Sequence, residues 1–98
     1  MAKAPTIEIQ NFTSPGSTYR VDAAKYEAMR GAMLAALPAA EPGVTVAELK
    51  TALLPHLPAA LFPGGAKAGW WLKAVQLDLE AKGLVRRTAT SPLRFYRT

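Results

Sequence analysis

Residues 69–96 read GWWLKAVQLDLEAKGLVRRTATSPLRFY and carry the strongest structural signals in the chain. The apolar residues of the first half recur at helical spacing and predict a helix over residues 66–82. Gly83 follows, and glycine commonly supplies the left-handed conformation that ends a helix. Two short segments, 84–87 and 93–97, flank a polar turn and predict a β-hairpin. This half of the chain is therefore expected to be one helix followed by a two-stranded hairpin.

The N-terminal part of the chain carries weaker signals. Residues 6–10, TIEIQ, alternate polar and apolar side chains, which is typical of a short strand. The sequence SPGS at 14–17 is a cluster of turn-forming residues. Asp22 is a suitable N-cap for a helix that ends near Leu37, just before a proline.

A second helix is expected after Thr45, because Thr45 and Glu48 have the spacing of a capping box. Pro55 limits this helix, and the sequence PGG at 63–65 marks a break before the next one. The residues that the second helix is expected to bury are Val46, Leu49 and Leu53, with Leu54 as a further candidate.

Composition limits the possible classes of protein. With 98 residues the chain fits one domain, and it contains no run of about 20 apolar residues that could span a membrane. There is no cysteine, so disulfides and thiol catalysis are excluded. The first ten residues show no apolar signal segment, and a cytoplasmic protein without a membrane partner is expected.

The formal charge of +5 is concentrated at the C-terminus. Residues 83–98 contain four arginines and no acidic residue. Clustered arginines can bind phosphate through two parallel hydrogen bonds, so a nucleic acid is a possible partner. A solvated hairpin with a basic bias explains the same charges equally well.

The order of the predicted elements resembles the winged helix-turn-helix domain. The closest local matches are LEAKGLVRR at 79–87, where the third helix passes into the hairpin, and TVAEL at 45–49, where the second helix starts. The resemblance implies an α+β fold over residues 22–98, with a three-helix core and a C-terminal β-hairpin wing. Residues 1–21 then form an N-terminal extension that contains a short strand and packs on the domain.

The whole chain also resembles a family of small bacterial proteins of uncharacterised activity. The shared blocks are IEIQN, PGSTYRVDAAKYEAMR and FPGGAKAGWWLKAVQLDLEAKG. This second resemblance implies no activity. The winged-helix resemblance implies DNA binding of the transcription-regulator type, in which the third helix enters the major groove.

The outer face of the predicted third helix differs from that of a DNA-reading helix. At 100° per residue, one face consists of Ala68, Leu72, Val75 and Leu79 and is expected to meet the core. The opposite face consists of Trp70, Lys73, Ala74, Leu77 and Ala81. Only one of these side chains is basic, whereas base edges are usually read by Arg, Asn or Gln. A helix that is apolar all round is usually buried, so this helix is expected to pack on two sides.

The sequence leaves three candidates for the element that covers this outer face: the N-terminal extension, a second copy of the chain in a homodimer, or a different protein. The predicted interface residues are Trp70, Ala74 and Leu77. If double-stranded DNA is bound, we expect phosphate contacts through the hairpin, at Arg86, Arg87 and Arg94, assisted by Lys67 and Lys73. Such contacts give affinity that depends on salt without reading the sequence.

No catalytic site is predicted. The single histidine, His56, lies next to a proline, and the serines do not occur in a Gly-x-Ser-x-Gly turn. The glycine-rich segment 63–67 lacks the spacing of a phosphate-binding loop. The sequence therefore predicts a binding protein without a metal ion or cofactor, and leaves two functions open: DNA binding through a basic hairpin, or protein interaction through the third helix.

Overall fold

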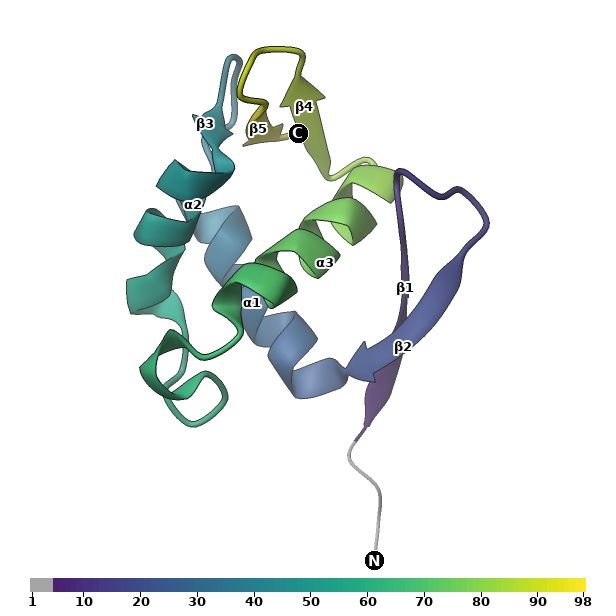
Figure 1. The fold of residues 1–98 in the computed structure, drawn as a ribbon, viewed down its shortest axis with the longest axis vertical. Coiled ribbons are helices and arrows are strands. Elements are labelled where there is room, and N and C mark those ends of the chain that lie inside the picture. The colour runs from purple at the N-terminus through teal and green to yellow at the C-terminus, as the bar shows by residue number, and fades with distance from the viewer. Residues whose placement is uncertain (1–4) are drawn as a thin grey trace, which may run out of the picture.

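The computed structural model describes residues 5–98, so the first four residues of the predicted N-terminal extension lie outside the described part. This part is α+β, as predicted, with three α-helices and two small antiparallel sheets (Figure 1). The elements in chain order are β1 (Thr6–Gln10), β2 (Thr18–Asp22), α1 (Ala23–Ala36), β3 (Val44–Thr45), α2 (Val46–Leu53), two 3₁₀ turns (Leu54–His56 and Pro63–Gly65), α3 (Ala68–Ala81), β4 (Val85–Thr88) and β5 (Arg94–Arg97).

The first two strands form an N-terminal hairpin. The predicted strand β1 is confirmed, and it pairs with β2 so that Ile9 lies opposite Tyr19. The turn between them contains Gly16 in the left-handed region, with φ 90°. Strand β2 was not predicted, because only a few residues separate the turn from the helix cap and an alternation that short is not distinctive. Ile9 and Val21 are buried and face the rest of the protein.

The cap predicted for α1 is confirmed, because the Asp22 carboxylate accepts a hydrogen bond of 2.9 Å from the backbone N–H of Lys25. The buried face of α1 contains Tyr26, Met29, Ala32 and Met33. The helix ends before Pro38, whose carbonyl accepts a hydrogen bond of 2.9 Å from the N–H of Arg97. The end of α1 is thereby joined to the last strand.

The capping box of α2 is also confirmed. The Glu48 N–H donates to Thr45 Oγ1 over 3.2 Å, and the Thr45 N–H donates to Glu48 Oε1 over 2.9 Å. Leu49 and Leu53 are buried as predicted. Val46 is 38% exposed, and Leu54, which lies in the 3₁₀ turn after the helix, is 39% exposed, so the prediction of their burial is wrong. At 100° per residue Val46 lies about 60° around the helix from Leu49, at the edge of the buried stripe.

Helix α3 begins at Ala68 and not at residue 66. Pro63–Gly65 forms a separate 3₁₀ turn, and Lys67 adopts a left-handed backbone with φ 60°, so a regular helix cannot start earlier. The C-terminal stop is confirmed at Gly83, where φ is 77°. The C-terminal hairpin of β4 and β5 follows, with Arg87 opposite Phe95.

Strand β3 adds to this hairpin and gives a three-stranded sheet in the order β3-β5-β4. The chain approaches β5 closely at Gly43, where φ is 85° and an added Cβ would lie 2.1 Å from the carbonyl oxygen of Phe95. Val85 and Phe95 close the core from this side. Figure 1 shows α3 in the middle of the molecule, with α1 behind it, α2 on one side, the N-terminal hairpin on the other and the three-stranded sheet at one end.

Candidate functional site

The outer face of α3 is largely covered. Among the 14 residues of this helix only Gly69, Trp70 and Lys73 are exposed. Trp70 is 54% exposed, whereas Ala74 is 4% and Leu77 is 8% exposed. Of the three residues predicted for an interface, Ala74 and Leu77 are therefore buried within the chain itself, and Trp70 alone is available to a partner.

The N-terminal hairpin supplies part of this cover. The backbone N–H of Phe12 donates a hydrogen bond of 3.2 Å to the carbonyl oxygen of Leu77. The backbone N–H of Gln10 donates a hydrogen bond of 2.9 Å to the carboxylate of Asp78. Two successive residues of α3 thus bind the end of β1 and the start of its turn, on the side of the helix where the sequence predicts an apolar outer face.

Asp78 connects this hairpin to α1. Its side chain is completely buried. It accepts a hydrogen bond from the hydroxyl of Tyr26 and one of 2.9 Å from Nζ of Lys82. Burial raises the pKa of Tyr26 well above its usual range, and the hydrogen bond to Asp78 raises it further. The donors from β1 and α1 fix the position of α3, whereas Lys82 belongs to the end of the same helix.

A second buried carboxylate, Glu80, holds Arg87. The guanidinium donates from Nε to Oε2 over 2.6 Å and from Nη2 to Oε1 over 2.9 Å. It also lies 5.0 Å from the ring centroid of Phe12 and 5.6 Å from that of Phe95. The hydrogen bonds from Arg87 to Glu80 raise the pKa of the arginine. Arg87, one of the residues predicted to contact DNA, joins the two hairpins to α3.

The other predicted arginines differ in their environment. Arg94 is half-buried and donates from Nη1 to the carbonyl oxygen of Gly43 and to Glu48, each over 3.3 Å. Two hydrogen bonds from Thr45, and to a lesser degree the charge of Arg94, lower the pKa of Glu48. Arg86 and Arg97 are exposed, and neither forms an ion pair within residues 5–98.

Two depressions lie beside the exposed residues of α3. The first, which we call the C-terminal groove, has a volume of about 290 Å³ and runs between the start of α2, the middle of α3 and the C-terminal hairpin. Its walls are mainly apolar. They consist of Thr45, Val46, Ala47, Lys73, Gln76, Arg87, Pro92, Leu93 and Phe95.

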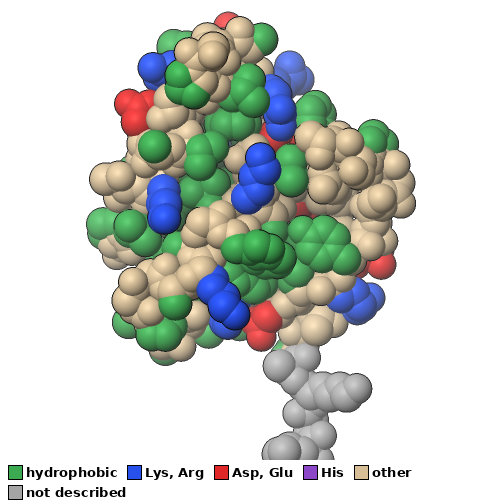
Figure 2. Space-filling model, in the orientation of Figure 1, with side chains coloured by type: hydrophobic (Ala, Val, Ile, Leu, Met, Phe, Trp, Pro, Cys, Tyr) green, Lys and Arg blue, Asp and Glu red, His purple; other side chains and the backbone are tan. Residues whose placement is uncertain are grey.

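The second depression, which we call the Trp70 surface, is open, has a volume of about 500 Å³ and is lined by Lys25, Lys67, Trp70 and Trp71. Trp71 is buried and meets the edge of Phe62, with ring centroids 6.3 Å apart. Trp70 packs edge-to-face on Trp71 at 5.1 Å and leaves its other side in solvent. Figure 2 shows hydrophobic side chains gathered in the middle of this side of the molecule, with Lys and Arg side chains spread around them.

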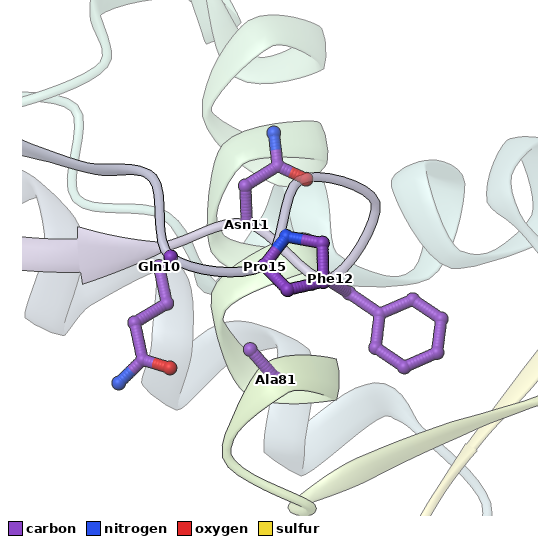
Figure 3. Close-up of a pocket in the computed structure, with 6 residues that line it drawn as sticks. Gln10, Asn11, Phe12, Pro15 and Ala81 are labelled. Atoms are coloured by element: carbon purple, nitrogen blue, oxygen red, sulfur yellow. The ribbon is translucent and has the colours of Figure 1, made fainter.

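A smaller hollow of about 260 Å³ lies where the turn of the N-terminal hairpin meets the end of α3. Asn11, Phe12 and Pro15 of the turn lie over α3 near Ala81, and the ring of Phe12 points away from the side chain of Gln10 (Figure 3). No charged residue lines it. We interpret this hollow as the seam between the hairpin and the helix.

The described part of the chain offers no metal site, since residues 5–98 contain no group of three or more His, Asp or Glu side chains that could hold an ion. His56 is exposed at the end of a 3₁₀ turn. No helix within residues 5–98 has both the length and the apolar character needed to cross a membrane.

Three polar residues of α3 have contacts that were not predicted from the sequence: Gln76, Asp78 and Glu80. Their signal in the sequence is local. Gln76 and Glu80 are four residues apart, and the Nε2 of Gln76 does donate to Oε1 of Glu80 over 2.8 Å. Asp78 and Lys82 have the same spacing and form an ion pair. The partners from β1 and α1 are distant in sequence, and Arg87 on β4 lies beyond the Gly83 turn, so no helical spacing reveals these contacts.

Comparison with known proteins gives one match. No curated protein and no solved structure matches the chain. The model of a family of unknown function (DUF6958) matches residues 6–95, which include every helix and all but the last residues of the final strand. The chain therefore belongs to this family of unknown function, DUF6958.

Proposed function

We propose that the chain is a winged-helix module that binds another protein through the Trp70 surface. The order of a helix, a short strand, a capped helix, a longer helix and a hairpin supports the winged-helix assignment of residues 22–98. The pairing of β3 with β5 supports it too, because it joins the start of α2 to the hairpin. In this assignment α3 is the third helix and the C-terminal hairpin is the wing.

The covered face of α3 is the observation that carries the choice of a protein partner. A helix that reads DNA must present polar side chains to the base edges of the major groove. Here the exposed side chains of α3 are those of Trp70 and Lys73, and the N-terminal hairpin is bonded to Leu77 and Asp78. Insertion of this helix into a groove would require the hairpin to leave and would expose a completely buried carboxylate.

The chemistry of the Trp70 surface fits a protein. Tryptophan is enriched among residues that dominate the energy of protein interfaces, because it buries a large area and loses little rotamer freedom. Lys25 and Lys67 line the same depression. A partner that places an apolar side chain against Trp70, with acidic residues beside it, matches both the aromatic surface and the charge.

A second copy of the chain fits this surface less well. A two-fold interface brings the same patch of both subunits together. Lys25 and Lys67 of the two copies would then face each other around Trp70, and like charges at an interface are unfavourable. We therefore assign the surface to a different, acidic protein.

A second candidate function is sequence-independent binding to phosphates through the C-terminal hairpin. Its support is the exposure of Arg86 and Arg97 without an ion pair in residues 5–98. The buried pair of Arg87 with Glu80 and the pair of Arg94 with Glu48 reduce the charge that is free for DNA. Binding of this kind is expected to be weak and to disappear as salt increases.

The proposal can be tested by placing a photo-crosslinking amino acid at position 70 in cells that normally produce the protein. We expect one protein adduct that protease removes and nuclease does not. The matched control carries the same amino acid at the exposed Glu8, which lies on the outer side of β1. This position should give no such adduct.

Two results would refute the assignment. An adduct at position 70 that nuclease removes would favour a nucleic acid, and an adduct with the mass of two copies of the chain would favour a homodimer. The DNA candidate has its own test, in which a labelled random duplex is titrated at low salt. When Arg86→Ala is added, the anisotropy of the duplex should stay unchanged at protein concentrations at which the wild type binds.

A further inference from the structure

We propose that the C-terminal groove is a binding site for a small organic acid that has an apolar body, one carboxylate and one N–H or O–H donor. This inference does not depend on the Trp70 surface, which lies at the start of α3 and shares no lining residue with the groove. Nothing in the family assignment gives the groove a role. The inference rests on one buried acceptor, one cation and the apolar walls.

The acceptor is Oε1 of Gln76. Gln76 is 1% exposed, forms part of the groove wall, and its Oε1 has no hydrogen-bond partner within residues 5–98. The orientation of the amide is fixed by its neighbour, because Nε2 donates to Glu80, and a carboxylate paired with Arg87 can only accept. An unpaired buried acceptor is costly, and a ligand donor that reaches Oε1 through the groove wall removes that cost.

The cation is Lys73, which is exposed on the same side of α3, one turn before Gln76. It forms no ion pair within residues 5–98. The guanidinium of Arg87 also lines the groove, but its charge is already matched by Glu80. Among residues 5–98 the groove therefore has one unmatched positive charge, and a single carboxylate balances it.

Apolar side chains form the rest of the walls. Val46 and Leu93 are each 38% exposed and are the sequence neighbours of the paired residues Thr45 and Arg94, and Phe95 lies buried in the groove wall. The volume of about 290 Å³ is at the lower end of the range for ligand pockets, which favours a compact acid over a long chain. An aliphatic or aromatic body placed against Val46 and Leu93 would cover both.

N-acetyl-leucine is a suitable probe, because it combines an aliphatic side chain, an amide N–H and a carboxylate. We expect it to shift the backbone amide resonances of Thr45, Val46 and Leu93 with a dissociation constant in the millimolar range, as is usual for a ligand of this size. Its methyl ester lacks the carboxylate, and its N-methyl derivative lacks the donor. Each of these should bind about tenfold more weakly than N-acetyl-leucine.

Variants of the protein test the same two contacts from the side of the groove. Gln76→Met and Lys73→Met should each weaken binding of N-acetyl-leucine about tenfold, and Lys50→Met, an exposed lysine outside the groove, should not change it. Retention of the wild-type thermal unfolding midpoint in Gln76→Met separates a lost contact from a lost fold. Absence of shifts up to about 20 mM probe, or equal binding of the ester, would overturn the proposal. A peptide ending in leucine that binds far more tightly than the free acid would overturn the choice of a small ligand.

Discussion

Replacement of Asp78 by asparagine should destabilise the protein strongly although it changes almost no volume. The carboxylate accepts from the Gln10 N–H, the Tyr26 hydroxyl and Nζ of Lys82. In Asp78→Asn, Oδ1 can still accept from Gln10. The new NH₂ group faces two donors, the hydroxyl of Tyr26 and Nζ of Lys82. Tyr26 is only 2% exposed, so its hydroxyl loses its acceptor.

The magnitude follows from these contacts. A hydrogen bond to a charged group contributes about 1.5–3 kcal/mol, which is the cost expected for the Tyr26 hydroxyl. The side chain of Lys82 is 33% exposed and can turn to solvent, so its ion pair adds only about 0.5 kcal/mol. We expect a total loss of about 2–3.5 kcal/mol, which leaves a domain of ordinary stability folded.

Urea unfolding followed by tryptophan fluorescence measures this loss. The control is Glu8→Gln, which removes an exposed carboxylate on the outer side of the N-terminal hairpin and should change the free energy of unfolding by less than about 0.5 kcal/mol. In a double-mutant cycle, Asp78→Asn and Tyr26→Phe should couple by at least about 1 kcal/mol. A free energy of unfolding for Asp78→Asn within about 0.5 kcal/mol of the wild type would refute this role.

Three further predictions concern the backbone and the titrating groups. Gly43→Ala should lower the thermal unfolding midpoint more than any exposed substitution, because φ is 85° and the added Cβ would meet the Phe95 carbonyl at 2.1 Å; an unchanged midpoint would contradict this close approach. Hydrogen bonds lower the pKa of Glu48, so its stabilising effect is present above the ordinary carboxyl pKa and is lost as pH falls through the pKa of the folded state. The thermal unfolding midpoint of Glu48→Gln should therefore change less on acidification than that of the wild type. Burial and Asp78 raise the pKa of Tyr26, so its stabilising effect is present below about pH 10 and is lost as pH rises towards the folded pKa. In an alkaline titration of tyrosinate absorbance, Tyr26→Phe should remove the last step.

The parts of the fold that depend on local chemistry were predictable from the sequence. The Asp22 cap, the Thr45 and Glu48 capping box and the Gly83 stop each involve residues within a few positions, and each is confirmed. The start of α3 was placed two residues too early. The left-handed Lys67 lies between a glycine-rich turn and the helix, and nothing in the identity of a lysine marks that conformation.

The tertiary contacts of α3 were only half predictable. The apolar outer face indicated packing on two sides, and the burial of Ala74 and Leu77 agrees with that expectation. The sequence did not select among the three possible coverings, because contact between Phe12 and Leu77 depends on where the hairpin lies in space. For the same reason the sequence named Arg87 as a phosphate contact and did not reveal that Glu80 holds it on both oxygens.

Cysteine labelling tests the central claim most directly, that the chain's own fold covers the outer face of α3 at Ala74 and Leu77. The chain contains no cysteine, so a single introduced thiol reports on one position. We expect Lys73→Cys to react with a thiol reagent as fast as a free cysteine. Ala74→Cys, one residue further along the helix and 4% exposed, should react at least about a hundredfold more slowly under native conditions. Equal rates at the two positions would show an open outer face and would contradict the account.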